Sequence, residues 1–184
     1  MTDLFKYCPH CAGTIEYKPV PDDTHPRHIC NECNTIHYLN PKIVTGVLPI
    51  LNDKVLLARR AIEPRKGLWN VPAGYMENGE KIEEGAEREL WEEANAKVKN
   101  IRPHLIYSIA AIHQVYMLFI GDLVDDSFSP GIESLEVALF SEAEIPWDEL
   151  AFTSSIVCIK RYFENQKNKT DKVHLEHYVH TRNL

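Results

Sequence analysis

Residues 74–96, GYMENGEKIEEGAERELWEEANA, decide how the rest of this chain is interpreted. The segment begins as a loop containing Gly and Asn. From position 81 to 94 its composition predicts a helix, with Ile82, Ala86 and Leu90 at i, i+4 spacing on one face. The segment holds eight Glu but only one Lys and one Arg. Like charges at i, i+4 destabilise a helix, so a helix that is merely solvated would usually carry more Lys.

Three of these carboxylates are predicted to converge. On a helical wheel Glu89, Glu92 and Glu93 share one face, next to the core-facing side of Leu90. Converging carboxylates are the ligands that hard divalent cations such as Mg²⁺ and Mn²⁺ prefer. Spacing alone leaves one alternative open, an acidic surface helix without a bound ion.

The same stretch resembles the Nudix box, G-x5-E-x7-R-E-U-x-E-E-x-G-U, in which U is a bulky aliphatic residue. Two positions depart from the pattern, because Asn95 stands where the box has Gly and the small Ala96 stands at the last aliphatic position. Asn is the next best residue after Gly for the left-handed conformation that ends a helix. We therefore expect the replacement to affect the end of the helix slightly and the acidic side chains very little. The matching positions are Gly74, Glu80, Arg88, Glu89, Leu90, Glu92 and Glu93.

Four cysteines near the amino end form the pattern Cys8-x2-Cys11-x18-Cys30-x2-Cys33. Two such pairs can close a tetrahedral shell around Zn²⁺ with no open position, which predicts a structural rather than a catalytic zinc. The segment has few large apolar residues, so the metal would supply folding free energy that the local core cannot. Nearby histidines at positions 10, 28 and 37 could replace a thiolate, although solvated side chains are the commoner case.

The chain is expected to divide into a zinc ribbon at residues 1–40, a Nudix domain at 41–165 and a C-terminal tail at 166–184. Beyond position 40, strands are predicted over 43–51, 54–58, 101–109, 113–124 and 135–140, with a helix from about 153 to 165 that Thr153 or Ser154 would cap. This order indicates an α+β fold, and the resemblance implies an α/β/α sandwich with a mixed sheet between helices. The tail could be disordered or could add an edge strand at a dimer contact.

The resemblance extends to one subgroup, the zinc-ribbon Nudix hydrolases typified by plant chloroplast FAD pyrophosphatases. It rests on the four-cysteine start, on the segment GLWNVPAGYME at residues 67–77 and on PGIESLEVALF at 130–140. It implies divalent-metal-dependent hydrolysis of the pyrophosphate bond in a nucleoside diphosphate derivative, with release of AMP. FAD and ADP-ribose are the favoured substrates, and a dinucleotide or a nucleotide-sugar-like molecule is the expected class.

The resemblance also implies residue roles. Glu92 and Glu93 are the leading Mg²⁺ or Mn²⁺ ligands, Glu89 ligates or acts on the water, and the Gly74 carbonyl supplies a further oxygen. Arg88 is expected to orient the carboxylates by pairing with Glu84, Glu92 or Glu80. A carboxylate from a distant loop often completes such a site, and we expect Glu136 in this role, with Glu133 as the other candidate.

Substrate contacts are predicted from residue types. Tyr75 and Tyr116, with Phe119, could stack on a flat ring, although strand aromatics usually belong to the core. Glu77 could add an oxygen, and Arg60, with Arg59 and Arg65 nearby, could hold outer phosphates or be an ordinary surface charge.

Two alternatives stay open. One is an NADH pyrophosphatase, which also combines a zinc ribbon with a Nudix box but carries an SQPWPFP-like segment that is missing from residues 107–116 here. The other is a non-catalytic binding module in which the ribbon docks nucleic acid or protein. Residues 1–40 hold three Lys and Arg against five Asp and Glu, and no basic stripe occurs elsewhere, so no nucleic-acid partner is expected.

Composition places the chain among ordinary globular proteins. It has 184 residues, of which 44% are hydrophobic and 26% charged, and a net charge of −7. No apolar run approaches about 18 residues, and the amino end lacks the basic start and apolar segment of a signal peptide. We therefore expect a cytoplasmic protein without a membrane partner, and the resemblance implies a possible homodimer.

Overall fold

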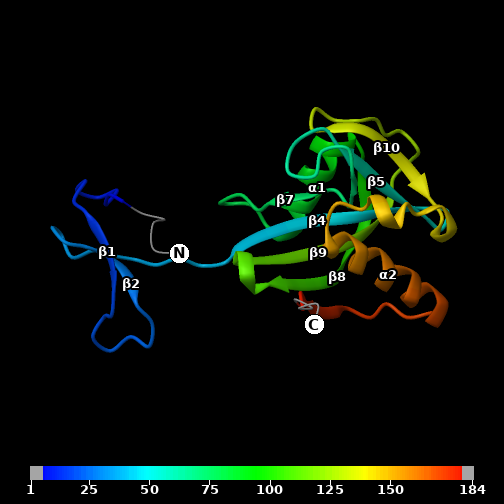
Figure 1. Ribbon diagram of the computed structural model, residues 1–184. Helices are drawn as coiled ribbons and strands as arrows, with labels where there is room; N and C mark the ends of the chain where they lie inside the picture. The colour runs from blue at the N-terminus through cyan, green and yellow to red at the C-terminus, as the bar shows by residue number, and fades with distance from the viewer. Residues whose placement is uncertain (1–5, 180–184) are drawn as a thin grey trace. The chain divides into compact units, whose positions relative to one another are not determined.

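The computed structural model describes residues 6–179, which fall into two compact units, one ending at Asn40 and one beginning at Pro41 (Figure 1). The last five residues of the expected tail lie outside the described residues. The first unit is a three-stranded antiparallel sheet with few apolar contacts, in the order β1-β2-β3. Its strands are β1 (Ile15–Lys18), β2 (Arg27–Cys30) and β3 (Ile36–His37).

The second unit is built around one mixed sheet in the order β10-β5-β4-β9-β8-β11, with the short β6 and β7 paired to β5 and β4. Strands β4 and β9 pair in parallel, as do β8 and β11, and the other pairs are antiparallel. The strands are β4 (Lys42–Leu51), β5 (Lys54–Arg60), β6 (Trp69–Asn70), β7 (Ala73–Tyr75), β8 (Val98–Ile109), β9 (Gln114–Leu123), β10 (Ser134–Phe140) and β11 (His174–His177).

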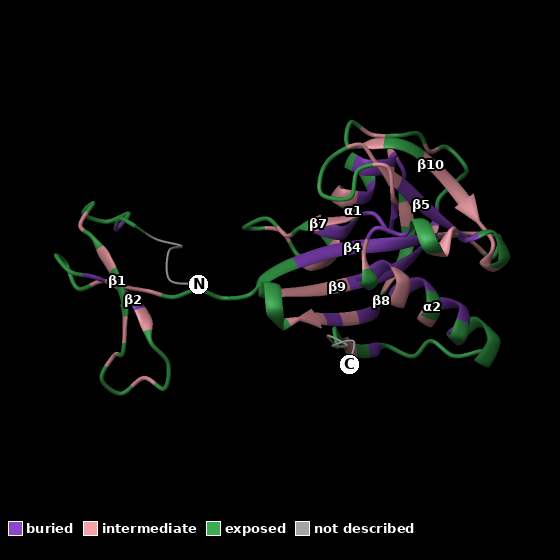
Figure 2. Ribbon diagram, in the orientation of Figure 1, coloured by how far each residue is buried: buried purple, intermediate pink, exposed green. Residues whose placement is uncertain are grey.

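Side chains alternate between the two faces of this sheet, and each face carries a helix. On β4, Val47 packs with helix α1 (Ile82–Ala94), whereas the next residue, Leu48, packs with helix α2 (Thr153–Asn168). On β5, Leu56 belongs to the α1 face and Leu57 to the α2 face. Period-two alternation with apolar residues on both sides requires cover on both sides. The predicted α/β/α sandwich is therefore confirmed, and Figure 2 shows the buried residues concentrated in these strands.

Local elements follow the sequence patterns closely. Helix α1 begins where the Glu84 carboxylate accepts the Lys81 backbone N–H at 2.9 Å, and it ends at Asn95, whose φ of 47° is left-handed. The expected turn at positions 52 and 53 joins β4 and β5 with two left-handed residues, as a tight hairpin requires. Three 3₁₀ turns connect the remaining elements: Ala110–Ile112, Glu142–Glu144 and Trp147–Glu149.

Within the described residues, part of the tail forms a strand, which was one of the two outcomes considered from the sequence. Helix α2 begins after Phe152, so Thr153 and Ser154 lie in its first turn rather than capping it, and the helix runs on to Asn168. The buried Asn165 then draws the chain back, because its amide donates to the Lys172 carbonyl at 2.8 Å. Strand β11 consequently joins the edge of the sheet beside β8. No helix among residues 6–179 is long and apolar enough to cross a membrane.

Candidate active site and four-cysteine centre

Helix α1 presents its carboxylates to strand β7 because its apolar side is fixed on the sheet. Ala86, Leu90 and Ala94 are fully buried on that side. The Glu89 carboxylate lies directly against Gly74, where a β-carbon would come within 2.4 Å of the carboxylate atoms. A side chain at position 74 would therefore displace the Glu89 carboxylate from its place against β7. The buried Glu93 accepts the backbone N–H of Ala73 at 3.4 Å, so both carboxylates are fixed against β7.

Arg88 organises the acidic face. Its Nε and Nη2 donate to the two carboxylate oxygens of Glu80 at 3.0 and 2.9 Å, and its Nη1 donates to Glu89 at 2.7 Å and to Glu92 at 3.2 Å. Nη2 also donates to the backbone carbonyl of Tyr75 at 3.1 Å. A guanidinium is well suited to this because its donors lie in a fixed plane. Pairing with Glu84 was also considered from the sequence, but that residue pairs with Lys81 at 3.0 Å.

The carboxylates differ in their affinity for protons. Burial raises the pKa of Glu93 to about 8, and the nearby charge of Glu89 adds to the rise. Burial also raises the pKa of Glu89, although the Arg88 guanidinium opposes the effect. The hydrogen bonds from Arg88 lower the pKa of Glu80 to about 2, so that carboxylate stays ionised. The carboxylates of Glu80, Glu89 and Glu93 therefore lie in different electrostatic environments, and such differences are characteristic of functional sites.

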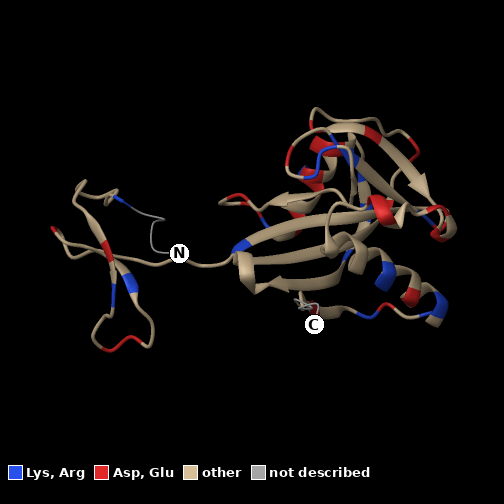
Figure 3. Ribbon diagram, in the orientation of Figure 1, with Lys and Arg blue, Asp and Glu red and all other residues tan. Residues whose placement is uncertain are grey.

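Glu89, Glu92 and Glu93 line a cavity of about 820 Å³, which is large enough for a dinucleotide-sized ligand. Figure 3 shows the acidic residues gathered on and around α1. Arginines also line the cavity, and so does the first turn of α2, where backbone N–H groups have no partner within the helix. An apolar part of the wall is formed by Ile109, Ile112, Tyr116, Leu118 and Phe152.

Of the two loop acids considered from the sequence, Glu133 lines the cavity and Glu136 does not. Glu136 belongs to β10, opposite Arg59 on β5, and forms an ion pair with it at 3.6 Å. Glu133 precedes β10, and the pairing of β10 with β5 has a register shift between Ser134 and Glu136. The charge of Glu133 raises the pKa of both Glu89 and Glu93, which indicates proximity to the helix carboxylates.

The expected substrate contacts divide in the same way. Tyr75, Glu77 and Arg60 line the cavity, together with Tyr116 and Arg65. Arg60 lies over the ring of Phe152, with its Cζ 5.2 Å from the centroid, and its Nε donates to the Pro64 carbonyl at 2.9 Å. By contrast, Phe119 is a core residue beneath α1.

Sequence reasoning missed several residues of the wall. Gln114 joins two tyrosines, since its amide donates to the Tyr75 hydroxyl at 2.8 Å and its carbonyl accepts the Tyr116 hydroxyl at 3.0 Å. The first turn of α2 and Phe152 also went unrecognised. No local pattern identifies these residues, because they reach the cavity only through the packing of α2 and β9 around β4.

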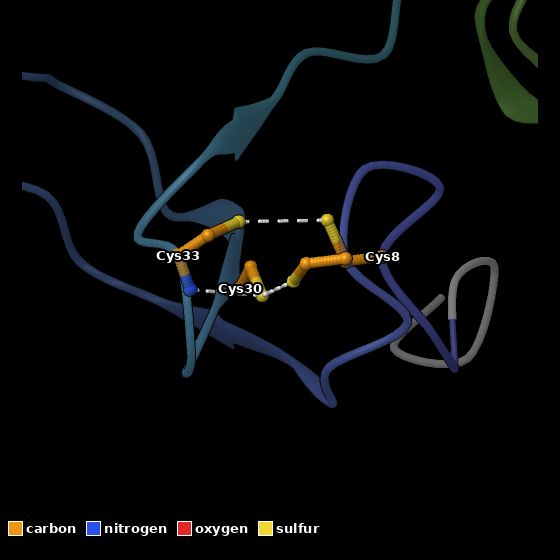
Figure 4. Close-up of side chains that lie close together, drawn as sticks. Cys8, Cys30 and Cys33 are labelled. Atoms are coloured by element: carbon orange, nitrogen blue, oxygen red, sulfur yellow. Dashed lines mark hydrogen bonds between the residues drawn. The ribbon is translucent and has the colours of Figure 1, made fainter.

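The compact group of potential metal ligands within residues 6–179 is the set of four cysteines, whose sulfurs lie within 4.8 Å of one another. The Cys8 and Cys33 sulfurs are 3.7 Å apart (Figure 4). The Cys11 and Cys30 sulfurs are 3.4 Å apart. These separations exceed a disulfide bond. They suit a tetrahedral Zn²⁺, in which bonds of about 2.3 Å place the sulfurs roughly 3.8 Å apart.

The surroundings of the cluster favour the thiolate form at Cys33 but not at Cys11, where a hydrogen bond from the Gly13 backbone opposes the neighbouring thiols, which raise the pKa to about 12. The Thr35 hydroxyl lies 3.1 Å from the Cys33 sulfur, and hydrogen bonds from Thr35 lower the pKa of Cys33 to about 6. His37 Nε2 lies 3.4 Å from the Cys8 sulfur, so one of the three histidines noted in the sequence does reach the cluster. The four sulfurs together form a complete tetrahedral donor set.

Comparison with known families identifies both units. The family described as the NUDIX domain matches residues 40–157, and the zinc ribbon described as Nudix N-terminal matches residues 6–39. The chain belongs to the Nudix hydrolase family. A solved Nudix hydrolase from Nitrosomonas europaea is 48% identical to this Nudix chain, with a TM-score of 0.91, and the match covers 95% of this chain and 99% of that one.

Other relatives are more distant. The NAD-capped RNA hydrolase NudC of Vibrio parahaemolyticus is 30% identical over 149 residues, which are 79% of this chain and 55% of that protein. The chain therefore spans about half the length of that curated relative. An ADP-ribose pyrophosphatase from Streptococcus suis is 17% identical, with a TM-score of 0.58 over 76% of this chain and all of that one, and this likeness concerns the fold alone.

Proposed function

We propose that this Nudix chain hydrolyses the pyrophosphate bond of a nucleoside diphosphate derivative and depends on Mg²⁺ or Mn²⁺. The observation that supports this best is that Glu89, Glu93 and Arg88 all line one cavity of about 820 Å³, with Arg88 paired to Glu89 at 2.7 Å. An acidic wall repels a diphosphate unless cations intervene, so carboxylates in such a place fit a cation-dependent site. The atoms on this wall that could ligate a metal are carboxylate oxygens, which suit a hard divalent ion.

Glu89, Glu92 and Glu93, with the Gly74 carbonyl, are the residues that would hold the cations. A divalent cation held there would neutralise charge on the diphosphate and acidify a water molecule. Arg88 keeps the helix carboxylates oriented, and it does not need to contact the substrate. Glu133 is the loop acid best placed to complete the set or to accept a proton from the attacking water, and its position makes it a better candidate than Glu136.

The remaining wall suits the organic part of such a substrate. Arg60, which lies over the Phe152 ring, can contact an outer phosphate, while Tyr75 and Tyr116 offer ring faces in the same cavity. Gln114 fixes the two tyrosine hydroxyls and so limits their freedom before binding. Glu77 lies at the same wall and is a candidate for a contact with a sugar hydroxyl.

FAD and ADP-ribose remain the favoured substrates, with release of AMP. NAD(H) is the second candidate, and its support is now stronger, because the NudC relative is named for hydrolysis of NAD-capped RNA. That name also removes the ground for excluding RNA as a partner, even though the first 40 residues are acidic. An RNA that carries an NAD cap at its end is therefore one of the substrates to be tested.

The test measures AMP release from ADP-ribose, FAD, NADH and an NAD-capped RNA, each with and without Mg²⁺. We expect hydrolysis of at least one substrate, strict dependence on the cation, and a fall in kcat of about 10²-fold or more for Glu93→Gln. Glu87→Gln is the matched control, because Glu87 lies exposed on the same helix away from the cavity wall. Equal rates for Glu93→Gln and Glu87→Gln would remove the assignment.

The four-cysteine centre is proposed to hold one structural Zn²⁺, as its closed set of four sulfurs suggests. A cytoplasmic location and a homodimer remain predictions. Sedimentation of the purified chain would decide the second. The alternative of a non-catalytic binding module would be favoured if the cation-dependent hydrolysis were missing while RNA or protein binding remained.

A further inference from the structure

Asn95 stands at the second glycine position of the Nudix box, and its side chain makes hydrogen bonds that a glycine could not make. Its backbone keeps the left-handed conformation with φ 47° and ψ 33°. Its Nδ2 lies 3.2 Å from both the carbonyl and the hydroxyl of Ser129, and 3.1 Å from the carbonyl of Pro130. A glycine would allow the same backbone but could make none of these contacts.

The loop that Asn95 contacts is also fixed to the end of α1 by its backbone. The N–H of Ser129 donates to the Ala94 carbonyl at 3.0 Å, and the N–H of Gly131 donates to the Glu93 carbonyl at 2.9 Å. These carbonyls belong to the last turn of the helix, which lacks partners of its own. The approach is so close that a β-carbon on Gly131 would lie 1.7 Å from the Glu92 carbonyl oxygen.

Beyond this contact the loop leads directly to Glu133. The N–H of Ser134 donates to the Gly131 carbonyl at 3.1 Å, and the N–H of Ala61 donates to the Glu133 carbonyl at 2.8 Å. The loop is thus held at the end of α1 on one side and at the end of β5 on the other. Between the two attachments, Glu133 lines the cavity.

We propose that Asn95 is a positioning residue that holds the loop 129–133 on the catalytic helix, so that Glu133 reaches the carboxylates of α1. The inference rests on the proposed function of the cavity. Asn95 itself does not line the cavity, so it acts through the loop. Asn in place of the box glycine therefore adds a contact between helix α1, which carries three acids of the candidate site, and the loop 129–133, which carries Glu133.

A double-mutant cycle with Asn95→Gly and Glu133→Gln tests this. Asn95→Gly keeps the left-handed backbone and loses the side-chain donor, and we expect kcat to fall about tenfold because Glu133 is displaced. In the Glu133→Gln background the same change should cost nothing further, since the group that Asn95 positions is already lost. Asn95→Asp, which keeps the size but has no N–H to donate, should behave like Asn95→Gly.

Asn100→Gly is the matched control. Asn100 is also left-handed, with φ 54°, and its amide donates to Asp122 at 2.9 Å, but it is exposed and lies outside the cavity wall. Its kcat should stay at the wild-type value. The cycle distinguishes positioning of Glu133 from a general loss of stability. A general loss of stability would lower kcat equally in the wild-type and Glu133→Gln backgrounds.

Hydrogen exchange of the Ser129 and Gly131 amides, followed by NMR, tests the positioning without any substrate. We expect roughly tenfold faster exchange of both amides in Asn95→Gly. Unchanged exchange, or an equal fall in kcat in both backgrounds of the cycle, would overturn the inference. If the wild-type chain hydrolysed none of the substrates, the proposed function would fail, and the exchange rates would still decide whether Asn95 holds the loop.

Discussion

Acid destabilisation of the Nudix unit should depend on His104. This side chain is almost completely buried on β8, and its Nε2 lies 3.1 Å from the Cys158 carbonyl of α2, to which it donates. Its ring packs edge-on against His174 of β11, with centroids 5.7 Å apart. Burial lowers the pKa of His104 from 6.5 to about 4, and the charges of His174 and Arg102 act in the same direction.

The sign and size follow from proton linkage. Below pH 6.5 the unfolded chain protonates this imidazole while the folded chain does not, so the free energy of unfolding falls as the pH drops from 6.5 towards 4 and changes little above 6.5. For one group with these pKa values, the loss between pH 7.5 and pH 5 is about 2 kcal/mol. The lowered pKa of His174 adds to the loss.

The assay is urea denaturation at pH 7.5 and pH 5 for the wild type, His104→Gln and, as a control, His177→Gln. His104→Gln should lose about 2 kcal/mol less than the wild type between the two pH values, because Gln can donate to the Cys158 carbonyl but does not titrate. Because His177 is exposed, the His177→Gln variant should show the same change in free energy of unfolding between the two pH values as the wild type. Identical pH dependence for the wild type and His104→Gln would refute the reasoning.

Three further outcomes are expected. Metal analysis should find one Zn²⁺ per chain, and Cys30→Ser should release it and unfold the first unit, which loss of dispersed NMR signals from residues 6–40 would reveal. Arg88→Gln should lower the free energy of unfolding in urea denaturation, because Glu80 loses the guanidinium that donates to both of its carboxylate oxygens; an unchanged free energy of unfolding would contradict this. Leu90→Ala should cost about 3 kcal/mol by the same measurement, whereas the half-exposed Trp91→Ala should cost far less.

Much of the fold was predictable because its periodicities are local. The apolar runs of β4 and β5, and the i, i+4 spacing along α1, are properties of single elements, so the sequence displays them directly. The helix expected over 81–94 is observed as Ile82–Ala94. The end of the chain was less predictable. Asn165 shows no pattern of its own, and β11 forms only because α2, ending nearby, brings the chain back to β8.

The candidate site divides along the same line. Glu89, Glu92 and Glu93 lie on one helix face and Arg88 beside them, so one turn of helix geometry was enough to group them. The choice between Glu133 and Glu136 was different, because it depends on the long-range pairing of β10 with β5, in which Glu136 lies opposite Arg59.

The sequence by itself determined the two candidate metal-binding groups, since each consists of residues within a fixed short spacing: two CxxC pairs and one turn of helix. Tertiary structure alone decided what surrounds them. The cavity wall comes from β7, β9, the start of α2 and the loop to β10, which are far apart in the chain and meet because the sheet buries both of its faces. Short spacings are fixed by bond geometry, whereas long-range neighbours are fixed by the packing of complete elements.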